Sequence, residues 1–317
     1  MNNMIIPTER PKIVFQGELG ANSHIACLDP AYRSFEPMPR PTFEDTIDAV
    51  ANGQAELAMI PIENSVAGRV ADIHHLMPSA GLYIIAELFV PISNLLLAPK
   101  GAKLSEIKSV ESHIMALDQC RRFFREHEVK RVVAVDTAAA ARDVGLRGDP
   151  TCAAIASRLA AERYGLDVLL ESVSDDPNAT TRFVVLSRQF QRPPRGNGPL
   201  LTTFVFEVKN IPAALYKALG GFATNGVNMT KLESYMLDGT FSATQFYCDV
   251  EGHPHDPGLK LALEELRFFS QPDSVRILGV YPAHKYRQEM RQKALLARAM
   301  RQVSAEAAIG EDYGALR

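Results

Sequence analysis

The sequence predicts an α/β protein in two parts, an alternating strand–helix region followed by a smaller βαββαβ unit. Two patterns support this prediction. Short apolar runs typical of buried strands alternate with helix-like segments up to about residue 190. The Pro- and Gly-rich linker 191–199 then leads into a strand–helix–strand–strand–helix–strand order, which is the ferredoxin-like arrangement. With 46% hydrophobic and 22% charged residues in a chain of 317, a packed core is expected.

The first region begins with an expected strand at 12–16, a Gly-containing loop and a helix at 24–28. A helix at 42–52 follows, because Thr42 is a good N-cap and Gly53 suits the position after the last turn. The further elements expected here are, in order, strands at 57–62, 82–90 and 95–98, a segment at 105–110 that ends in a strand, a helix at 112–126, a strand at 131–135, a helix at 137–145, a strand at 152–155, a helix at 157–164, and strands at 168–170 and 184–187.

A break near Pro91 divides the region 11–190 into two lobes. Lobe 1 is expected at about 11–92 plus 174–190, and lobe 2 at about 93–173.

The second unit is expected at 200–283. Asp238-Gly239 is a strong hairpin signal between its two middle strands. Its expected elements are strands at 201–208, 227–237, 240–250 and 275–281, and helices at 213–225 and 257–269. The tail 284–317 is basic and rich in helix formers, so it is either a docking helix or a frayed end.

Composition argues against several kinds of partner. The formal net charge is −3 and no long basic run occurs, so nucleic acid is not expected and any anion must be recognised by a few placed groups. The four cysteines lack CxxC spacing, and neither His74-His75 nor His253 and His255 has metal-site spacing, so no metal is predicted. The chain shows no secretory signal and no apolar run long enough to span a bilayer, which predicts a cytoplasmic protein.

Candidate functional side chains gather at strand ends. The segment before the apolar run 183–186 carries Asn178, Thr180, Thr181 and Arg182, a hydroxyl and guanidinium set that suits an anionic substrate. Hydrogen bonding to nearby backbone is the alternative interpretation of the same residues.

Three strand-to-helix loops carry further polar groups. The loop from Gly17 to Ser23 is either a small-anion cradle or an ordinary turn. The run Glu63-Asn64-Ser65 either meets a ligand at the carboxyl end of the sheet or caps a helix. His113, after Ser112, either donates to a carboxylate or is simply solvated.

These segments, in this order, resemble prephenate dehydratase over roughly residues 12–282. The motifs that carry the resemblance are Phe15-Gln-Gly17 with Ser23-His24, Ala58-Met-Ile-Pro-Ile-Glu-Asn-Ser65, Ser112-His113, Ala116-Leu-Asp-Gln-Cys120, Thr181-Arg-Phe-Val-Val-Leu186 and Gly226-Val-Asn-Met-Thr-Lys-Leu-Glu-Ser234. The resemblance implies a bilobal catalytic domain similar to a type II periplasmic-binding-protein fold, followed by an ACT regulatory domain. It further implies a homodimer or homotetramer.

The implied reaction is the decarboxylative dehydration of prephenate to phenylpyruvate, carbon dioxide and water, with no cofactor or metal. Thr181 takes the place of the family's proton donor, and Arg182 beside it suits a carboxylate clamp. The other residues expected to bind substrate are Phe183, Asn64, Ser65, Glu63, Ser23, Ser112, His113 and Asn178.

The sequence departs from the family pattern at three places. Ser-His-Pro becomes Ser112-His113-Ile114, Gly-Ala-Leu becomes Ala213-Ala214-Leu215, and Glu-Ser-Arg-Pro becomes Glu233-Ser234-Tyr235-Met236. The residues implied in binding an L-phenylalanine effector are Ala214, Leu215, Asn228, Glu233 and Ser234. Since two of the changes fall here, we expect the ACT domain to bind phenylalanine weakly, differently or not at all.

Two rival functions remain open. Arogenate dehydratase acts on a substrate that differs only in carrying an amino group in place of the keto group, and an acid such as Glu63 would favour that ammonium. A non-catalytic amino-acid sensor is the other, although the Thr181-Arg182-Phe183 motif argues against it.

Overall fold

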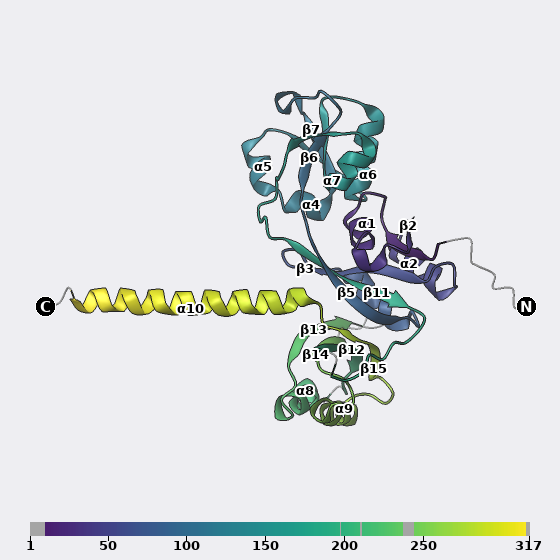
Figure 1. The fold of residues 1–317 in the computed structure, drawn as a ribbon, viewed down its shortest axis with the longest axis vertical. Helices are drawn as coiled ribbons and strands as arrows, with labels where there is room; N and C mark the ends of the chain where they lie inside the picture. Colours follow the sequence, from purple (N-terminus) through teal and green to yellow (C-terminus); the bar gives the residue numbers. More distant parts are fainter. Residues whose placement is uncertain (1–9, 197, 210, 237–243, 315–317) are drawn as a thin grey trace, which may run out of the picture. The chain divides into compact units, whose positions relative to one another are not determined.

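The computed structural model describes residues 10–196, 198–209, 211–236 and 244–314. Contacts divide the chain into two compact units, Met1–Pro282 and Ala283–Arg317 (Figure 1). Two β-sheets and their helices form the first unit, and the predicted α/β fold class is confirmed. No helix in the described part of the chain has both the length and the apolar character needed to cross a membrane.

A ten-stranded sheet runs through the first unit in the order β13-β14-β12-β15-β5-β11-β3-β1-β2, with β4 paired to β3. Its strands are β1 (Lys12–Gln16), β2 (Glu36–Arg40), β3 (Leu57–Asn64), β4 (Gly68–Arg69), β5 (Tyr83–Pro91), β11 (Thr180–Ser187), β12 (Leu200–Glu207), β13 (Met229–Met236), β14 (Thr244–Glu251) and β15 (Arg276–Pro282). The short strands β2 and β4 were not predicted, because they offer no apolar alternation and depend on pairing with β1 and β3.

A separate five-stranded sheet has the order β10-β6-β9-β7-β8. Its strands are β6 (Leu95–Ala98), β7 (Ser109–His113), β8 (Lys130–Ala134), β9 (Cys152–Ala156) and β10 (Asp167–Leu170). The chain enters this lobe after β5 and leaves it before β11, and the two crossings are joined where the Ile92 amide donates to the Ala179 carbonyl. The two lobes therefore meet at a double-stranded connection.

The helices of the two lobes are short. They are α1 (Asn22–Cys27), α2 (Phe43–Ala51), α3 (Ala71–Leu76), α4 (Ile114–Asp118), α5 (Arg121–Glu126), α6 (Thr137–Arg147) and α7 (Arg158–Tyr164). The single helix predicted at 112–126 is wrong. Its first residues belong to β7, and the helix then breaks at Gln119 and Cys120, where the Asp175 carboxylate caps a new start by accepting from the Arg121 and Arg122 amides.

Helices α8 (Ala214–Thr224) and α9 (Pro257–Phe269) complete the order β12-α8-β13-β14-α9-β15, the ferredoxin-like arrangement predicted from the sequence. Phe204, Phe206, Phe222 and Leu263 lie in the core between its helices and strands. The predicted Asp238-Gly239 turn lies outside the described residues, although β13 and β14 on either side pair antiparallel. The unit Ala283–Arg317 contains the long helix α10 (Lys285–Gly314).

Strand β11 decides how the site is built. All eight of its residues are buried, and it pairs antiparallel with both β3 and β5. The strand begins at Thr180, earlier than the sequence predicts, because both neighbours extend far enough to pair with Thr181. Consecutive side chains on a strand point to opposite faces, so Thr181 and Arg182 face different surroundings.

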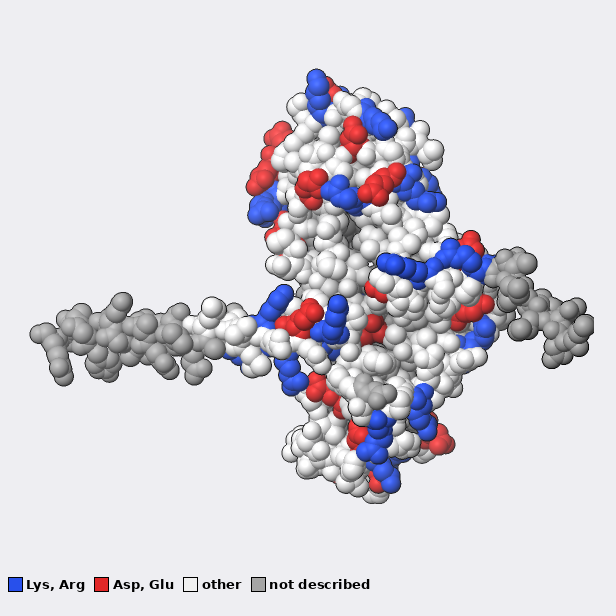
Figure 2. All heavy atoms as spheres, in the orientation of Figure 1, with Lys and Arg blue, Asp and Glu red and all other residues white. Residues whose placement is uncertain are grey.

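On the face drawn in Figure 2, the Lys and Arg side chains of the described residues are interspersed with Asp and Glu. This mixture agrees with the net charge of −3.

Candidate active site

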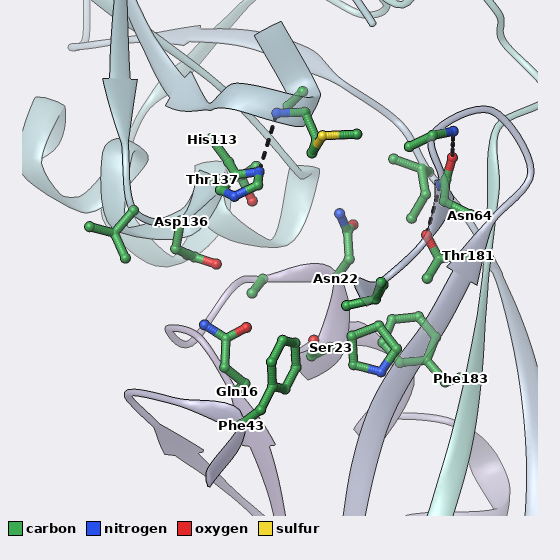
Figure 3. A pocket seen from close by; sticks show the side chains of 18 of the residues that line it. Gln16, Asn22, Ser23, Phe43, Asn64, His113, Asp136, Thr137, Thr181 and Phe183 are labelled. Atoms are coloured by element: carbon green, nitrogen blue, oxygen red, sulfur yellow. Dashed lines mark hydrogen bonds between the residues drawn. The ribbon is translucent and has the colours of Figure 1, made fainter. Parts of the chain in front are cut away.

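A cavity of about 690 Å³ lies between elements of the two lobes. Lobe 1 contributes Gln16 at the end of β1, Asn22 and Ser23 on α1, Asn64 at the end of β3, and Thr181 with Phe183 on β11. Lobe 2 contributes residues from two segments, 113–119 and 135–137, namely His113, Met115, Ala116, Gln119, Val135, Asp136 and Thr137 (Figure 3). The carboxyl ends of several strands therefore meet at one cavity, which is where ligands bind in open α/β folds.

The Thr181 hydroxyl is held in a defined hydrogen bond. Its Oγ1 accepts from Nδ2 of Asn64 at 2.9 Å, and only 9% of the residue is exposed. The Asn64 amide is itself oriented, because its Oδ1 accepts from the backbone amides of Val66 and Ala67, each at 2.9 Å. Since Asn64 donates to Oγ1, the proton on the Thr181 hydroxyl is available to a molecule in the cavity.

A chain of amides extends this arrangement. Gln119 Nε2 donates to Asn64 Oδ1 at 3.5 Å, and Asn94 Nδ2 donates to Gln119 Oε1 at 3.4 Å. Both Gln119 and Asn94 line the cavity, and neither was predicted as a site residue. Gln119 lies within the Ala116–Cys120 motif that supports the family resemblance, so that motif was the signal that could have found it.

His113 and Asp136 lie on the lobe 2 side of the cavity. Nδ1 of His113 accepts from the Met115 amide at 3.3 Å, so neutral His113 carries its proton on Nε2. Asp136 is the N-cap of α6, and its Oδ1 accepts from the amides of Ala138 and Ala139 at 2.8 and 2.9 Å. Burial raises the pKa of Asp136, against the lowering effect of those two hydrogen bonds.

The prediction that Arg182 clamps a carboxylate in the cavity is not supported by its position. Its side chain is 2% exposed and faces away from Thr181, toward β14 and β15. The guanidinium donates to Glu87 at 2.8 Å, to Glu63 at 2.9 Å, to Asp249 at 2.6 Å and to the Tyr281 hydroxyl at 3.0 Å. Its donors are therefore already engaged by protein groups.

Glu63 belongs to the same buried network and is not one of the residues that line the cavity. Its carboxylate accepts from Arg182 at 2.9 Å and from the Lys231 ammonium at 2.6 Å. Burial raises the pKa of Glu63, but the charges of Arg182 and Lys231 outweigh it and lower the pKa to about 2. Glu63 is thus not placed to meet a substrate ammonium.

Three other predicted substrate-binding residues also lie outside the lining of the cavity. Ser112 is fully buried, and its Oγ donates to the Ile155 carbonyl at 2.6 Å. Ser65 accepts from the Thr180 amide at 3.0 Å, so it fixes the start of β11. Asn178 is exposed in the turn before that strand. The structure therefore brings together Thr181, Phe183, Asn64, Ser23 and His113 from the predicted set.

The residues predicted to bind an effector lie in the βαββαβ unit. Ala214 and Leu215 begin α8, and Asn228 precedes β13. Glu233 accepts from Lys231 at 3.3 Å, and the Ser234 carbonyl accepts from Arg69 at 3.1 Å.

Ala213, before this helix, has φ of 59°, a left-handed conformation that favours glycine. Tyr235, in place of the family's arginine, is buried and stacks on His74 with ring centroids 4.9 Å apart.

Comparisons with known proteins show which family the chain is similar to. A family model described as prephenate dehydratase matches residues 13–191. A bifunctional N-acyl-homoserine lactone acylase/prephenate dehydratase of Komagataeibacter europaeus is 50% identical over 87% of this chain and 98% of that protein. An arogenate dehydratase/prephenate dehydratase of Arabidopsis thaliana is 37% identical over 86% of this chain and 72% of that protein.

A solved structure of a prephenate dehydratase is also similar to this chain. Prephenate dehydratase from Arthrobacter aurescens, in complex with L-Phe, is 35% identical and covers 86% of this chain and 90% of that chain, with a TM-score of 0.76. The resemblance carried by the sequence motifs is therefore confirmed, and the chain belongs to the prephenate dehydratase family.

Proposed function

We propose that the protein catalyses the decarboxylative dehydration of a prephenate-type cyclohexadienol in the cavity around Thr181. The bond from the ring to its carboxylate breaks, carbon dioxide leaves, and the electron pair of that bond enters the ring. The carbon–oxygen bond to the ring hydroxyl breaks, and the departing hydroxide gains a proton and leaves as water. Prephenate gives phenylpyruvate in this reaction, and arogenate gives phenylalanine.

The observation that carries this proposal is the hydrogen bond from Asn64 to Thr181. In this bond Thr181 Oγ1 accepts from Asn64, so the proton of the Thr181 hydroxyl is free to be donated to a ligand. A positioned donor of this kind, stabilising the departing hydroxide in the transition state, contributes roughly 10²–10⁴-fold to the rate.

Neutral hydrogen-bond donors suit the decarboxylation, in which the ring carboxylate leaves as carbon dioxide. Among the described residues lining the cavity, Gln16, Asn22, Ser23 and Gln119 offer neutral amide or hydroxyl groups, and the guanidinium of Arg69 is engaged by Glu233 and the Ser234 carbonyl. The substrate carboxylate loses its charge as carbon dioxide departs, so a tight guanidinium clamp would stabilise the ground state more than the transition state. Weak neutral donors can hold that group without raising the barrier.

The test gives the purified protein prephenate or arogenate at neutral pH and follows phenylpyruvate or phenylalanine, with an enzyme-free control for spontaneous conversion. Turnover of at least one substrate is expected. Replacing Thr181→Ala should lower kcat by roughly 10²–10⁴-fold while substrate still binds. If the protein turns over neither substrate, the proposed function is wrong. If Thr181→Ala keeps near-normal activity, Thr181 is not the hydrogen-bond donor to the departing hydroxide.

The βαββαβ unit serves in this proposal as an ACT-type regulatory domain. The Arthrobacter aurescens relative binds L-Phe in its solved structure, but Ala213 and Tyr235 alter the corresponding segments here. Phenylalanine should therefore bind weakly or not at all, and calorimetry measures this directly. Micromolar affinity with strong inhibition of turnover would contradict the expectation. Light scattering of the same sample tests the expected homodimer or homotetramer.

A second candidate activity is hydrolysis of N-acyl-homoserine lactones. It is favoured by the relative that is 50% identical, is matched over 98% of its length, and is described as bifunctional for this reaction. Incubation with an acyl-homoserine lactone and detection of the free fatty acid by mass spectrometry tests it. The Thr181→Ala variant separates the two activities, because acylase activity that survives it does not use the same donor.

A further inference from the structure

We propose that Asp136 recognises an α-ammonium group, so that the protein prefers arogenate to prephenate. This inference rests on the proposed function and assigns the substrate within the same cavity. Glu63, the acid that the sequence suggests for this role, is engaged by Arg182 and Lys231 outside the cavity, so a different carboxylate must be considered.

Asp136 has one carboxylate oxygen to spare. Its Oδ1 accepts both hydrogen bonds from the first turn of α6, while no described residue donates to Oδ2. Oδ2 lies against Gly17 of lobe 1, where a Cβ added to the glycine would come within 2.9 Å of it. The spare oxygen is thus held at the junction of the two lobes.

The shape of arogenate decides how far the group that binds its ammonium must lie from the group that binds its ring hydroxyl. The ring hydroxyl and the amino-acid side chain of arogenate stand on opposite carbons of a six-membered ring. If the hydroxyl meets Thr181, the side chain must lie across the cavity. Figure 3 shows Asp136 and Thr181 on opposite sides of the cavity, with Asn22 between them.

The charge of Asp136 also needs a partner. Burial raises its pKa, which means that the carboxylate is less stable there than in water. An ammonium donating to Oδ2 offsets that loss, whereas the keto group of prephenate brings no donor. A hydrogen bond between charged groups in such a place changes binding roughly 10–100-fold.

The neighbouring donors complete a recognition site for an amino acid. His113 presents Nε2–H and Thr137 a hydroxyl beside Asp136, and both line the cavity. They suit the α-carboxylate that stands next to the ammonium. Glu44 and Arg69 also line the cavity, but Asp136 is the acid that lies beside His113 and Thr137, so an ammonium and its α-carboxylate can be bound together there.

The test compares kcat/KM for arogenate and prephenate in the wild type and in Asp136→Asn. Asparagine caps a helix as well as aspartate does, so α6 should still begin normally. The wild type should favour arogenate, and the arogenate-to-prephenate ratio should fall roughly 10–100-fold in the variant.

Asp143→Asn is the matched control. It removes the same charge from the same helix at an exposed position that does not line the cavity, so the ratio should not change. If Asp136→Asn does not fold, Asp136→Ser is used in its place, because serine also offers an oxygen that caps the helix. A wild type that favours prephenate, or an unchanged ratio in a folded variant, overturns the inference. Absence of turnover on both substrates is instead a failure of the proposed function.

Discussion

At the scale of single residues, Thr181 lines the cavity, whereas the side chain of its neighbour Arg182 is buried on the other face of β11. The sequence predicted Thr181 as a site residue from its hydroxyl and its position beside an apolar run, and it predicted Arg182 for the same cavity. The direction of each side chain depends on where β11 begins, and that start is set by pairing with β3 and β5 rather than by local sequence. Asp136 was missed although it lies between a strand and a helix, after β8 and as the N-cap of α6.

Glu63 gives a pH prediction at this scale. Its pKa is lowered to about 2 in the folded protein from an ordinary value of 4.5, so its charge stabilises the fold above about pH 4.5. That contribution is lost as the pH falls from about 4.5 to about 2. It is at most about 3 kcal/mol, and less than that because the side chain is 32% exposed.

Urea unfolding of the wild type and Glu63→Gln at pH 6 and pH 3 measures this effect. The wild type should lose more stability than the variant between the two pH values. Equal losses in both proteins would show that Glu63 is not paired as described.

At the scale of elements, the succession of strands and helices along the chain could be predicted from sequence better than their boundaries could. The apolar runs found β1, β3, β5, β6 and β11 because burial on both sides leaves a continuous hydrophobic signal. The break between α4 and α5 could not be found, since the cap that starts the second helix comes from Asp175, more than 50 residues later in the chain.

Arg182 provides the prediction for β11. The Arg182 guanidinium donates to Glu87, Asp249 and Tyr281 at the same time. A lysine ammonium is a single point charge and cannot reach all three groups, so Arg182→Lys should destabilise the fold. Arg182→Met leaves buried acids unpaired and should cost about 3–5 kcal/mol. Thermal or urea unfolding gives the loss, and the KM of the folded variants should stay near that of the wild type.

Arg142→Lys is the control, because the Arg142 pairs are exposed and contribute about 1 kcal/mol or less. A large rise in KM for Arg182→Lys without loss of stability would restore the clamp interpretation.

At the scale of the whole molecule, the βαββαβ sheet and the sheet of lobe 1 are one sheet, joined where β15 pairs with β5. Gly279 lies opposite Ile84 at this junction, and a Cβ added there would stand 2.2 Å from the Ile84 carbonyl oxygen. Gly279→Ala should therefore push the two strands apart and cost about 1–3 kcal/mol, the usual range for an overpacked site.

Differential scanning calorimetry of Gly279→Ala checks this, with Gly220→Ala in α8 as the control, since nothing lies within 4 Å of a Cβ there. The control should match or exceed the wild-type Tm, because alanine favours a helix. A Gly279→Ala protein as stable as the wild type would mean that β15 and β5 are not joined at this residue.

The irregular pairing between Arg182 and Phe183 in β11 has a consequence for folding fidelity. If β11 paired one residue out of register, Thr181 and Arg182 would exchange faces. The guanidinium of Arg182 would then lie in the cavity, and a hydroxyl would lie among the acids Glu87 and Asp249. Such a misassembled chain would lose its activity and much of its stability in the same event. Any molecule folded well enough to survive would therefore already carry the Thr181 hydroxyl on the face of the cavity.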